Sequence, residues 1–193
     1  HEMSGTYQSA VNASRRVDDS SITVVDGLSA SVGLGLIVMK AAELAREGRN
    51  HNEIKESLFQ IITSTNIFIV VPDLSYVVKG GRLPGWVKTV ADFLHIRPIM
   101  TTKNDGSMGL AGAIMGTTNL PEKMSKFILG KMDTNKSYNI SIGHSNILAD
   151  GEELKELIRK GHHNLNSIHL QDMGCALGVH AGPGSLATAI QTV

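Results

Sequence analysis

Cysteine and aromatic residues are scarce in this sequence, and its positive and negative charges balance. Its 193 residues include one cysteine, Cys175, so an internal disulfide is excluded and the chain fits a reducing, cytoplasmic compartment. Aromatic residues make up only 4%, which argues against stacking of nucleic-acid bases. The formal net charge is +0, so the chain as a whole implies no large field toward nucleic acid or a membrane surface. We therefore expect no nucleic-acid partner and no stable membrane insertion.

Long apolar runs are also missing. The run from Leu34 to Met39 is far too short to cross a bilayer. The composition, with 41% hydrophobic and 19% charged residues, is ordinary for a globular protein that is long enough to bury a core. The chain opens with His1-Glu2-Met3 instead of a leading methionine. This start predicts a fragment from which an upstream part is missing.

Local patterns predict alternating strands and helices. β-Branched and apolar runs bounded by turn residues predict strands at 22–25, 67–71, 96–101, 108–114, 138–142, 168–170 and 186–190. The Asp105-Gly106 turn joins the third and fourth of these strands as a hairpin. Apolar spacing predicts helices after Thr6, at 31–47, from 50, at 74–78, at 86–94, from 119 and from 150. Helix-start signals are Asn50 with Glu53, Asn119 with Pro121, and Asp150 with Glu153.

This order of elements predicts an α/β fold with a mixed β-sheet and helices packed on it. The predicted domain boundary lies near residues 63–66. One predicted strand precedes that boundary, too few for a sheet, and about six follow it, enough for a self-standing domain. We therefore predict that residues 1–64 are the remnant of an N-terminal α/β domain and that residues 65–193 form a complete C-terminal α/β domain.

The stretch from Gly178 to Gly184 is the main candidate for a binding site. His180 lies there among glycines, in what reads as a loop, where its imidazole can donate a hydrogen bond to a carboxylate or phosphate. Gly182 and Gly184 would let backbone N–H groups approach the same anion. The alternative is a loop histidine that is satisfied by the backbone.

Two further stretches are predicted to serve the same polar site. Arg82 follows Gly80-Gly81, and its guanidinium suits bidentate contact with an anion. Ser4, Gly5 and Thr6 precede a helix and offer two hydroxyls and free N–H groups. The alternatives are a surface salt bridge for Arg82 and simple helix capping for Ser4 or Thr6.

Other site chemistries lack their required residues. The pair Gly33 and Gly35 has no third glycine at the dinucleotide-binding spacing, so close helix packing explains it better. His162, His163 and His169 have no acidic or cysteine ligand at partner spacing, so no metal site is predicted. A Gly-x-Ser-x-Gly elbow is absent and Cys175 has no evident base, so hydrolase chemistry lacks a nucleophile.

The motifs taken together resemble the DegV family, in order and spacing along almost the whole chain. They are Ser4-Gly5-Thr6-Tyr7-Gln8-Ser9-Ala10, Val24-Val25-Asp26, Ser29-Ala30-Ser31 with Gly33 and Gly35, Lys79-Gly80-Gly81-Arg82, Pro98-Ile99, Asp105-Gly106 and His180-Ala181-Gly182-Pro183-Gly184. The resemblance implies a protein that binds a long-chain fatty acid in an apolar tunnel between two α/β domains. It also implies that some members carry the acyl chain for bacterial fatty acid kinase, whose dihydroxyacetone-kinase-like subunit phosphorylates the carboxylate.

The resemblance implies a role for each matching residue. His180 would bond the carboxylate, with Ser4, Gly5 and Thr6 at the same polar end, and Arg82 would stabilise its loop or face the kinase. The chain departs from the family pattern at Asp26-Gly27, where Asp-Ser is frequent, and at Met115-Gly116, where Arg-Gly is frequent. Members also carry an upstream segment that shares the carboxylate, so this chain would hold half of the site.

We thus expect a bacterial, cytoplasmic lipid-binding protein that is not an enzyme and uses no cofactor. Two alternatives stay open. One is an enzyme that acts on a small phosphorylated or carboxylated substrate, with His180 as acid–base and Arg82 as clamp. The other is a regulatory or interaction domain linked to a kinase. If the first domain is absent, an exposed apolar wall would favour homo-oligomers.

Overall fold

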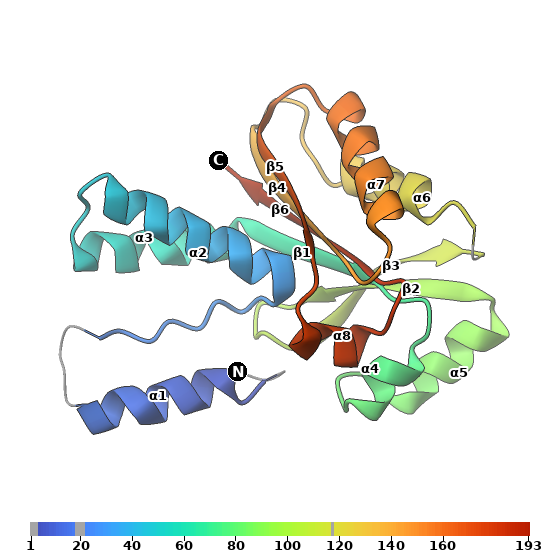
Figure 1. Ribbon diagram of the computed structural model, residues 1–193, viewed down its shortest axis with the longest axis horizontal. Coiled ribbons are helices and arrows are strands. Elements are labelled where there is room, and N and C mark those ends of the chain that lie inside the picture. The colour runs from blue at the N-terminus through green and yellow to red at the C-terminus, as the bar shows by residue number, and fades with distance from the viewer. Residues whose placement is uncertain (1–3, 18–21, 117) are drawn as a thin grey trace.

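The computed structural model describes residues 4–17, 22–116 and 118–193 (Figure 1). The opening residues His1-Glu2-Met3 lie outside the described residues. The strands are β1 Thr65–Val70, β2 Ile96–Thr102, β3 Met108–Met115, β4 Tyr138–His144, β5 Leu165–Asp172 and β6 Leu186–Thr192. The helices are α1 Thr6–Val17, α2 Ser31–Arg46, α3 His51–Thr63, α4 Ser75–Lys79, α5 Gly85–Phe93, α6 Leu120–Leu129, α7 Leu148–Gly161 and α8 Cys175–Ala181.

The strands form one six-stranded sheet in the order β3-β2-β1-β6-β4-β5. The predicted mixed sheet is confirmed, since it contains parallel and antiparallel pairs. The predicted hairpin is confirmed, since β2 and β3 pair antiparallel around the turn at Asp105-Gly106. β4 and β5 are the parallel pair, because α7 crosses over between them, and the other neighbours are antiparallel. The central strands β6 and β4 are buried along almost their whole length.

Helices cover both faces of this sheet. α6 and α7 bury Met124, Ile128, Leu154 and Ile158 against one face, which includes Phe68 and Ile140. On the opposite face, α4 and α5 pack over Met100, and α2 packs Val32 and Leu36 against Ile67. Figure 1 shows α6 and α7 on one side of the strands and α2, α4 and α5 on the other. The α/β class is therefore confirmed.

The N-terminal helices differ in how firmly they are held. α3 begins with a full capping box, in which Asn50 accepts from the Asn52 and Glu53 N–H groups while Glu53 accepts from the Asn50 N–H. α1 buries no residue. The predicted division at residues 64 and 65 coincides with the start of β1, yet α2 on the N-terminal side packs on the sheet. The two-domain division stays a prediction.

The predicted strand at 22–25 is wrong. Residues 22–27 run in extended, irregular backbone, and the six-strand sheet does not include them. Their neighbour is α3, where the Thr23 hydroxyl lies 2.8 Å from His51 Nε2. A β-branched run becomes a strand only when another backbone supplies the ladder partners, and α3 supplies side chains instead.

The predicted capping pair Asp150 and Glu153 is also wrong. α7 begins earlier, at Leu148, and its N-cap residue Ile147 makes no side-chain cap. Asn146, with φ of 58°, lies two residues before this helix start and four residues before Asp150. Asp150 instead lies inside the first turn, where a negative charge interacts favourably with the helix dipole.

Among the described residues, no helix is long and apolar enough to span a bilayer.

Asn50→Ala should destabilise the protein by about 1 kcal/mol, because the α3 N–H groups lose their side-chain acceptor. Asp150→Ala is the matched control, since it removes only a charge in the first turn and should cost at most about 0.5 kcal/mol. Urea unfolding of the two variants measures the difference. An equal loss in both would contradict the assignment of the helix starts.

Candidate functional site

The turn after α4 is built from two glycines and an arginine. The Gly81 N–H donates to the Val78 carbonyl at 2.9 Å, and the Arg82 N–H donates to the Val77 carbonyl at 3.1 Å. Gly81 has φ of 75°, a left-handed conformation that glycine adopts without strain. The half-buried Arg82 side chain turns back, and its Nη1 donates to the Gly80 carbonyl. Arg82 therefore closes its own turn.

His180 lies in a helix, which corrects the predicted loop. Residues from Cys175 to Ala181 form α8, and His180 occupies its last turn. The Gly182 N–H donates to the Gly178 carbonyl at 2.8 Å, and Gly182 then leaves the helix with φ of 76° and ψ of 167°. The sequence missed this helix because its flanking glycines also fit a loop.

The loop after α8 is fastened to the end of β4. The Gly184 N–H donates to the Ser145 carbonyl at 2.7 Å, and the Ser145 N–H donates to the Ser185 carbonyl at 3.0 Å. The buried Ser185 hydroxyl donates to the carbonyls of Ala181 and Gly182 at 2.7 and 2.9 Å. Ser185 thus satisfies carbonyls that the helix end would leave open. Sequence reasoning did not identify it.

Two glycines allow α4 and α8 to meet side by side. A Cβ atom on Gly80 would lie 2.5 Å from His180 Nδ1, so the imidazole lies directly on the glycine backbone. A Cβ atom on Gly182 would lie 2.6 Å from the Tyr76 ring. The structure therefore places Gly80, at the start of the Gly80-Gly81-Arg82 turn, against His180. That the two stretches hold one anion stays a prediction. Tyr76 is a further neighbour that the sequence analysis missed.

Ser4, Gly5 and Thr6 hydrogen-bond within the first turn of α1. The Ser4 hydroxyl accepts from the Thr6 N–H at 3.3 Å and lies 2.9 Å from the Thr6 hydroxyl. The Ser9 N–H donates to the Gly5 carbonyl at 2.9 Å. These hydrogen bonds fit the alternative from the sequence, in which Ser4 caps the start of the helix. The predicted contact of these residues with an anion beside His180 stays a prediction.

The start of α4 carries a perturbed carboxyl group. Asp73 accepts from the Ser75 N–H at 2.8 Å. Hydrogen bonds from the Ser75 side chain and then from its backbone lower the pKa of Asp73 below its usual value of 3.8. The positive charges of nearby Lys88 and Lys79 also lower the pKa of Asp73.

Within the described part of the chain, no three His, Cys, Asp or Glu side chains are grouped to hold a metal ion.

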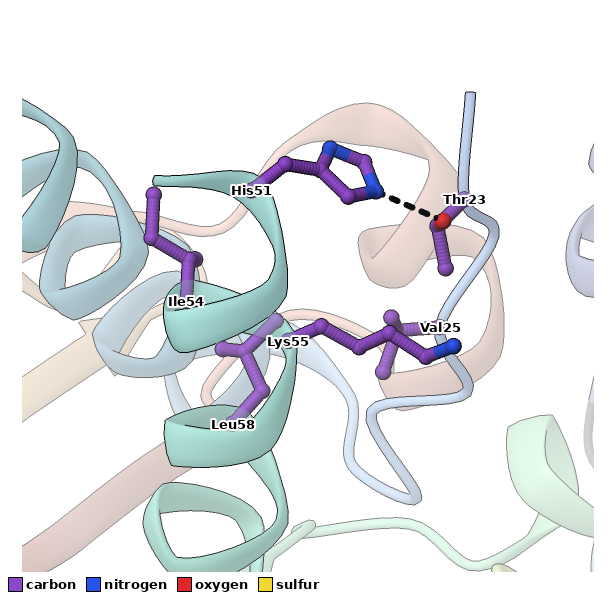
Figure 2. Close-up of a pocket in the computed structure, with 6 residues that line it drawn as sticks. All are labelled: Thr23, Val25, His51, Ile54, Lys55 and Leu58. Atoms are coloured by element: carbon purple, nitrogen blue, oxygen red, sulfur yellow. Dashed lines mark hydrogen bonds between the residues drawn. The ribbon is translucent and has the colours of Figure 1, made fainter. Parts of the chain in front are cut away.

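A pocket of about 140 Å³ lies elsewhere, between the segment at 22–26 and α3. Figure 2 shows its lining residues, with the His51 to Thr23 hydrogen bond at one end. They are Thr23, Val25, His51, Ile54, Lys55 and Leu58, and none of them belongs to the predicted site. Its volume is below the roughly 300 Å³ at which small-molecule sites typically begin, so a long acyl chain does not fit it.

Comparison with known proteins assigns the fold. Residues 1–193, the whole chain, match the family model described as "Uncharacterised protein, DegV family". The chain belongs to the DegV family. A curated DegV domain-containing protein of Clostridium perfringens is 31% identical over 189 residues, which cover 98% of this chain and 66% of that protein. The chain thus spans slightly less than two thirds of this relative's length.

Solved DegV structures have the same architecture. A protein from Thermotoga maritima with a fatty acid binding function is 26% identical, with a TM-score of 0.83 over 99% of this chain and 66% of that one. A DegV family protein from Ruminococcus gnavus, in a structure with vaccenic acid, is 25% identical, with a TM-score of 0.83 over 97% of this chain and 68% of that one. The family resemblance is therefore confirmed.

Gly182→Ala should destabilise the protein by roughly 1–3 kcal/mol, because its backbone conformation is nearly restricted to glycine and the new Cβ would meet Tyr76. Gly178→Ala, inside α8, is the matched control, since no neighbouring atom lies within 4 Å of the position of its Cβ. Alanine there should be neutral or stabilise by up to about 1 kcal/mol. Thermal unfolding measures both. Equal melting temperatures for the two variants would contradict the close approach.

The Asp73 carboxyl should titrate below its usual value of 3.8, because Ser75 stabilises the charged form. A lowered folded-state pKa means that the stabilisation is present at neutral pH and is lost as the pH falls through that lowered pKa. A carboxyl ¹³C NMR titration measures the midpoint directly. Ser75→Ala should move the midpoint back toward the usual value, and an unchanged midpoint would contradict the assigned cause.

Proposed function

We propose that this chain binds a long-chain fatty acid whose carboxylate lies at the end of α8. His180 would donate to the carboxylate, and the backbone N–H groups near Gly182 and Gly184 would approach it, with Arg82 holding the neighbouring turn. Ser4, Gly5 and Thr6 would join this polar end when the ligand is bound. The chain would act as a lipid carrier without a cofactor and without catalysing a reaction.

The observation that carries this proposal is the ligand of the DegV relatives. Proteins from Thermotoga maritima and Ruminococcus gnavus, 26% and 25% identical to this chain, bind a fatty acid and hold vaccenic acid respectively. This chain spans about two thirds of the length of such proteins. Fatty-acid binding by this length of chain is therefore a proposal in its own right.

The chemistry beside α8 supports the polar end. His180 is half-buried against Gly80, so its imidazole is oriented by packing. An imidazole N–H that donates to a carboxylate makes a charge-assisted hydrogen bond, which is stronger than a neutral one. A preoriented donor also loses less entropy when the ligand binds.

An apolar surface on α2 would take the acyl chain. A Cβ atom on Gly143 would lie 2.9 Å from Val32 and 3.5 Å from Met173, so the start of α2 lies beside the residue that leads into α8. The outward face of α2 exposes Leu34 and Val38 at 42% and 58%. Burial of each acyl CH₂ on such a surface would contribute about 0.8 kcal/mol before binding costs.

The finer role would be to present the bound acid to a dihydroxyacetone-kinase-like subunit. Met115, which stands where the family often has arginine, ends β3 and is 77% exposed. An apolar side chain at that position removes one charged contact that a kinase subunit could use. Lipid carriage is accordingly the broader proposal, and kinase presentation is its extension.

His180→Ala should lower fatty-acid affinity by roughly tenfold or more, because a hydrogen bond to a charged group contributes about 1.5–3 kcal/mol. Native followed by denaturing mass spectrometry of the purified chain identifies the bound acid, and titration with oleic acid measures the affinity. The matched control is His163→Ala, which removes an exposed imidazole after α7. A wild-type chain that neither carries nor takes up fatty acid would exclude binding at this chain length.

A further inference from the structure

Strand β3 forms one edge of the sheet and carries no feature that protects this edge. It lies first in the strand order, and within the described part of the chain it pairs only with β2. All eight of its residues are uncharged, and none is proline. Charged side chains and proline are common means by which proteins keep an edge strand from pairing with another chain. The free edge of β3 can therefore accept a further strand.

The pairing with β2 determines which peptide groups of β3 point outward. The Gly116 N–H donates to the His95 carbonyl at 3.2 Å, and the Lys103 N–H donates to the Ser107 carbonyl at 2.9 Å. In an antiparallel ladder, residues that hydrogen-bond to the partner strand alternate with residues that face away from it. Counted from these two ends, the residues whose peptide groups face away from β2 are Met108, Leu110, Ala113 and Met115.

A contact outside the sheet agrees with this direction. Lys123, on α6, donates from its Nζ to the Met115 carbonyl at 2.8 Å, so this carbonyl faces away from β2. The other outward groups of β3 make no backbone hydrogen bond to any described residue. An unpaired row of N–H and C=O groups is a template for another strand.

A bulge makes the outward row symmetric. The register shifts so that Gly112 lies opposite Ile99 while Leu110 lies opposite the next residue of β2, which leaves Ala111 as the extra residue. Two outward residues precede the bulge and two follow it, with the same spacing on either side. If Leu110 lies opposite Ala113 of a second copy, every outward residue therefore meets an outward residue. A two-fold axis requires this kind of self-complementary edge.

We propose that β3 pairs antiparallel with β3 of a second copy of this chain, so that two sheets join into one. Leu110 and Met115 are 55% and 77% exposed, and they lie on the same face of β3 as the exposed Ala113. Pairing would place these apolar side chains beside those of the second copy. No like charges meet across the axis, because β3 has no charged residue.

The opposite edge of the sheet is less suited to pairing. β5 ends at Asp172, whose side chain is 85% exposed, and it also carries the exposed His169. Charged side chains on an edge disfavour the approach of another strand. Since two-fold pairing uses the β3 edge of both copies, assembly should stop at a dimer. A strand of eight residues is about 27 Å long, so the interface is small and the dimer should be weak.

The first test measures mass and backbone exchange on the whole chain. Sedimentation velocity over a concentration series should show a monomer that converts to a dimer as the concentration rises. Hydrogen–deuterium exchange should slow with concentration at the outward amides of β3, among them Leu110 and Ala113. The β5 peptide, residues 165–172, is the internal control and should exchange at the same rate throughout. Neither measurement depends on fatty-acid binding.

Two substitutions then address the edge itself. Leu110→Lys should weaken the dimer roughly tenfold or more, because it replaces an apolar contact with a charge. Ala113→Pro should do the same by removing one outward N–H, and proline is tolerated on an edge where the N–H faces solvent. The matched control is Leu148→Lys at the start of α7, where the leucine is 58% exposed, and it should dimerise like the unmodified chain. Thermal unfolding checks that each variant folds.

Four outcomes would overturn the proposal. A chain that stays monomeric up to about 1 mM has no significant self-affinity. A dimer whose β3 amides exchange as fast as those of the monomer uses another surface. Outward β3 amides that already exchange slowly in the dilute monomer are covered by the chain itself. Folded Leu110→Lys and Ala113→Pro variants that dimerise like the unmodified chain would also exclude this edge.

Discussion

The close approach of α4 and α8 is the constraint on which the candidate site depends. Gly80 and Gly182 lie where side chains would collide, with His180 in one case and with Tyr76 in the other. Packing at this distance orients the imidazole without burying it completely. The loop hydrogen bonds through Ser145 and Ser185 then hold the end of α8 on β4. A polar group that is oriented yet accessible is what recognition of an anion requires.

The sheet supplies the rigid support for this arrangement. β6 and β4 are buried through the middle of the molecule, and helices pack on both of their faces. Buried polar side chains also connect the strands, because Asn139 donates to Gln191 at 3.2 Å and Gln191 donates to Thr65 at 2.9 Å. Satisfied polar contacts across β4, β6 and β1 favour this register, since a slip would leave each group unpaired. The site therefore lies on fixed elements.

Sequence patterns predicted most elements but not all of their environments. The hairpin at Asp105-Gly106 and the capping box at Asn50 depend on neighbours within a few residues, so local chemistry was sufficient. The segment at 22–25 has strand composition but pairs with no strand among the described residues, and composition does not report partners. His180 was identified as a candidate, whereas Tyr76 was missed because its contact with Gly182 joins distant parts of the chain.

The sequence by itself determined the α/β class, the family and the residue types available for an anion site. These follow from periodicity and from local motifs, which act over a few residues. Tertiary structure alone decided that His180 ends a helix, that Gly80 lies beneath its ring, and that Trp86 and Phe93 remain exposed while Val87 is buried. Which face of a short apolar helix reaches the core depends on long-range packing, because both faces have similar hydrophobicity and only one can contact the sheet.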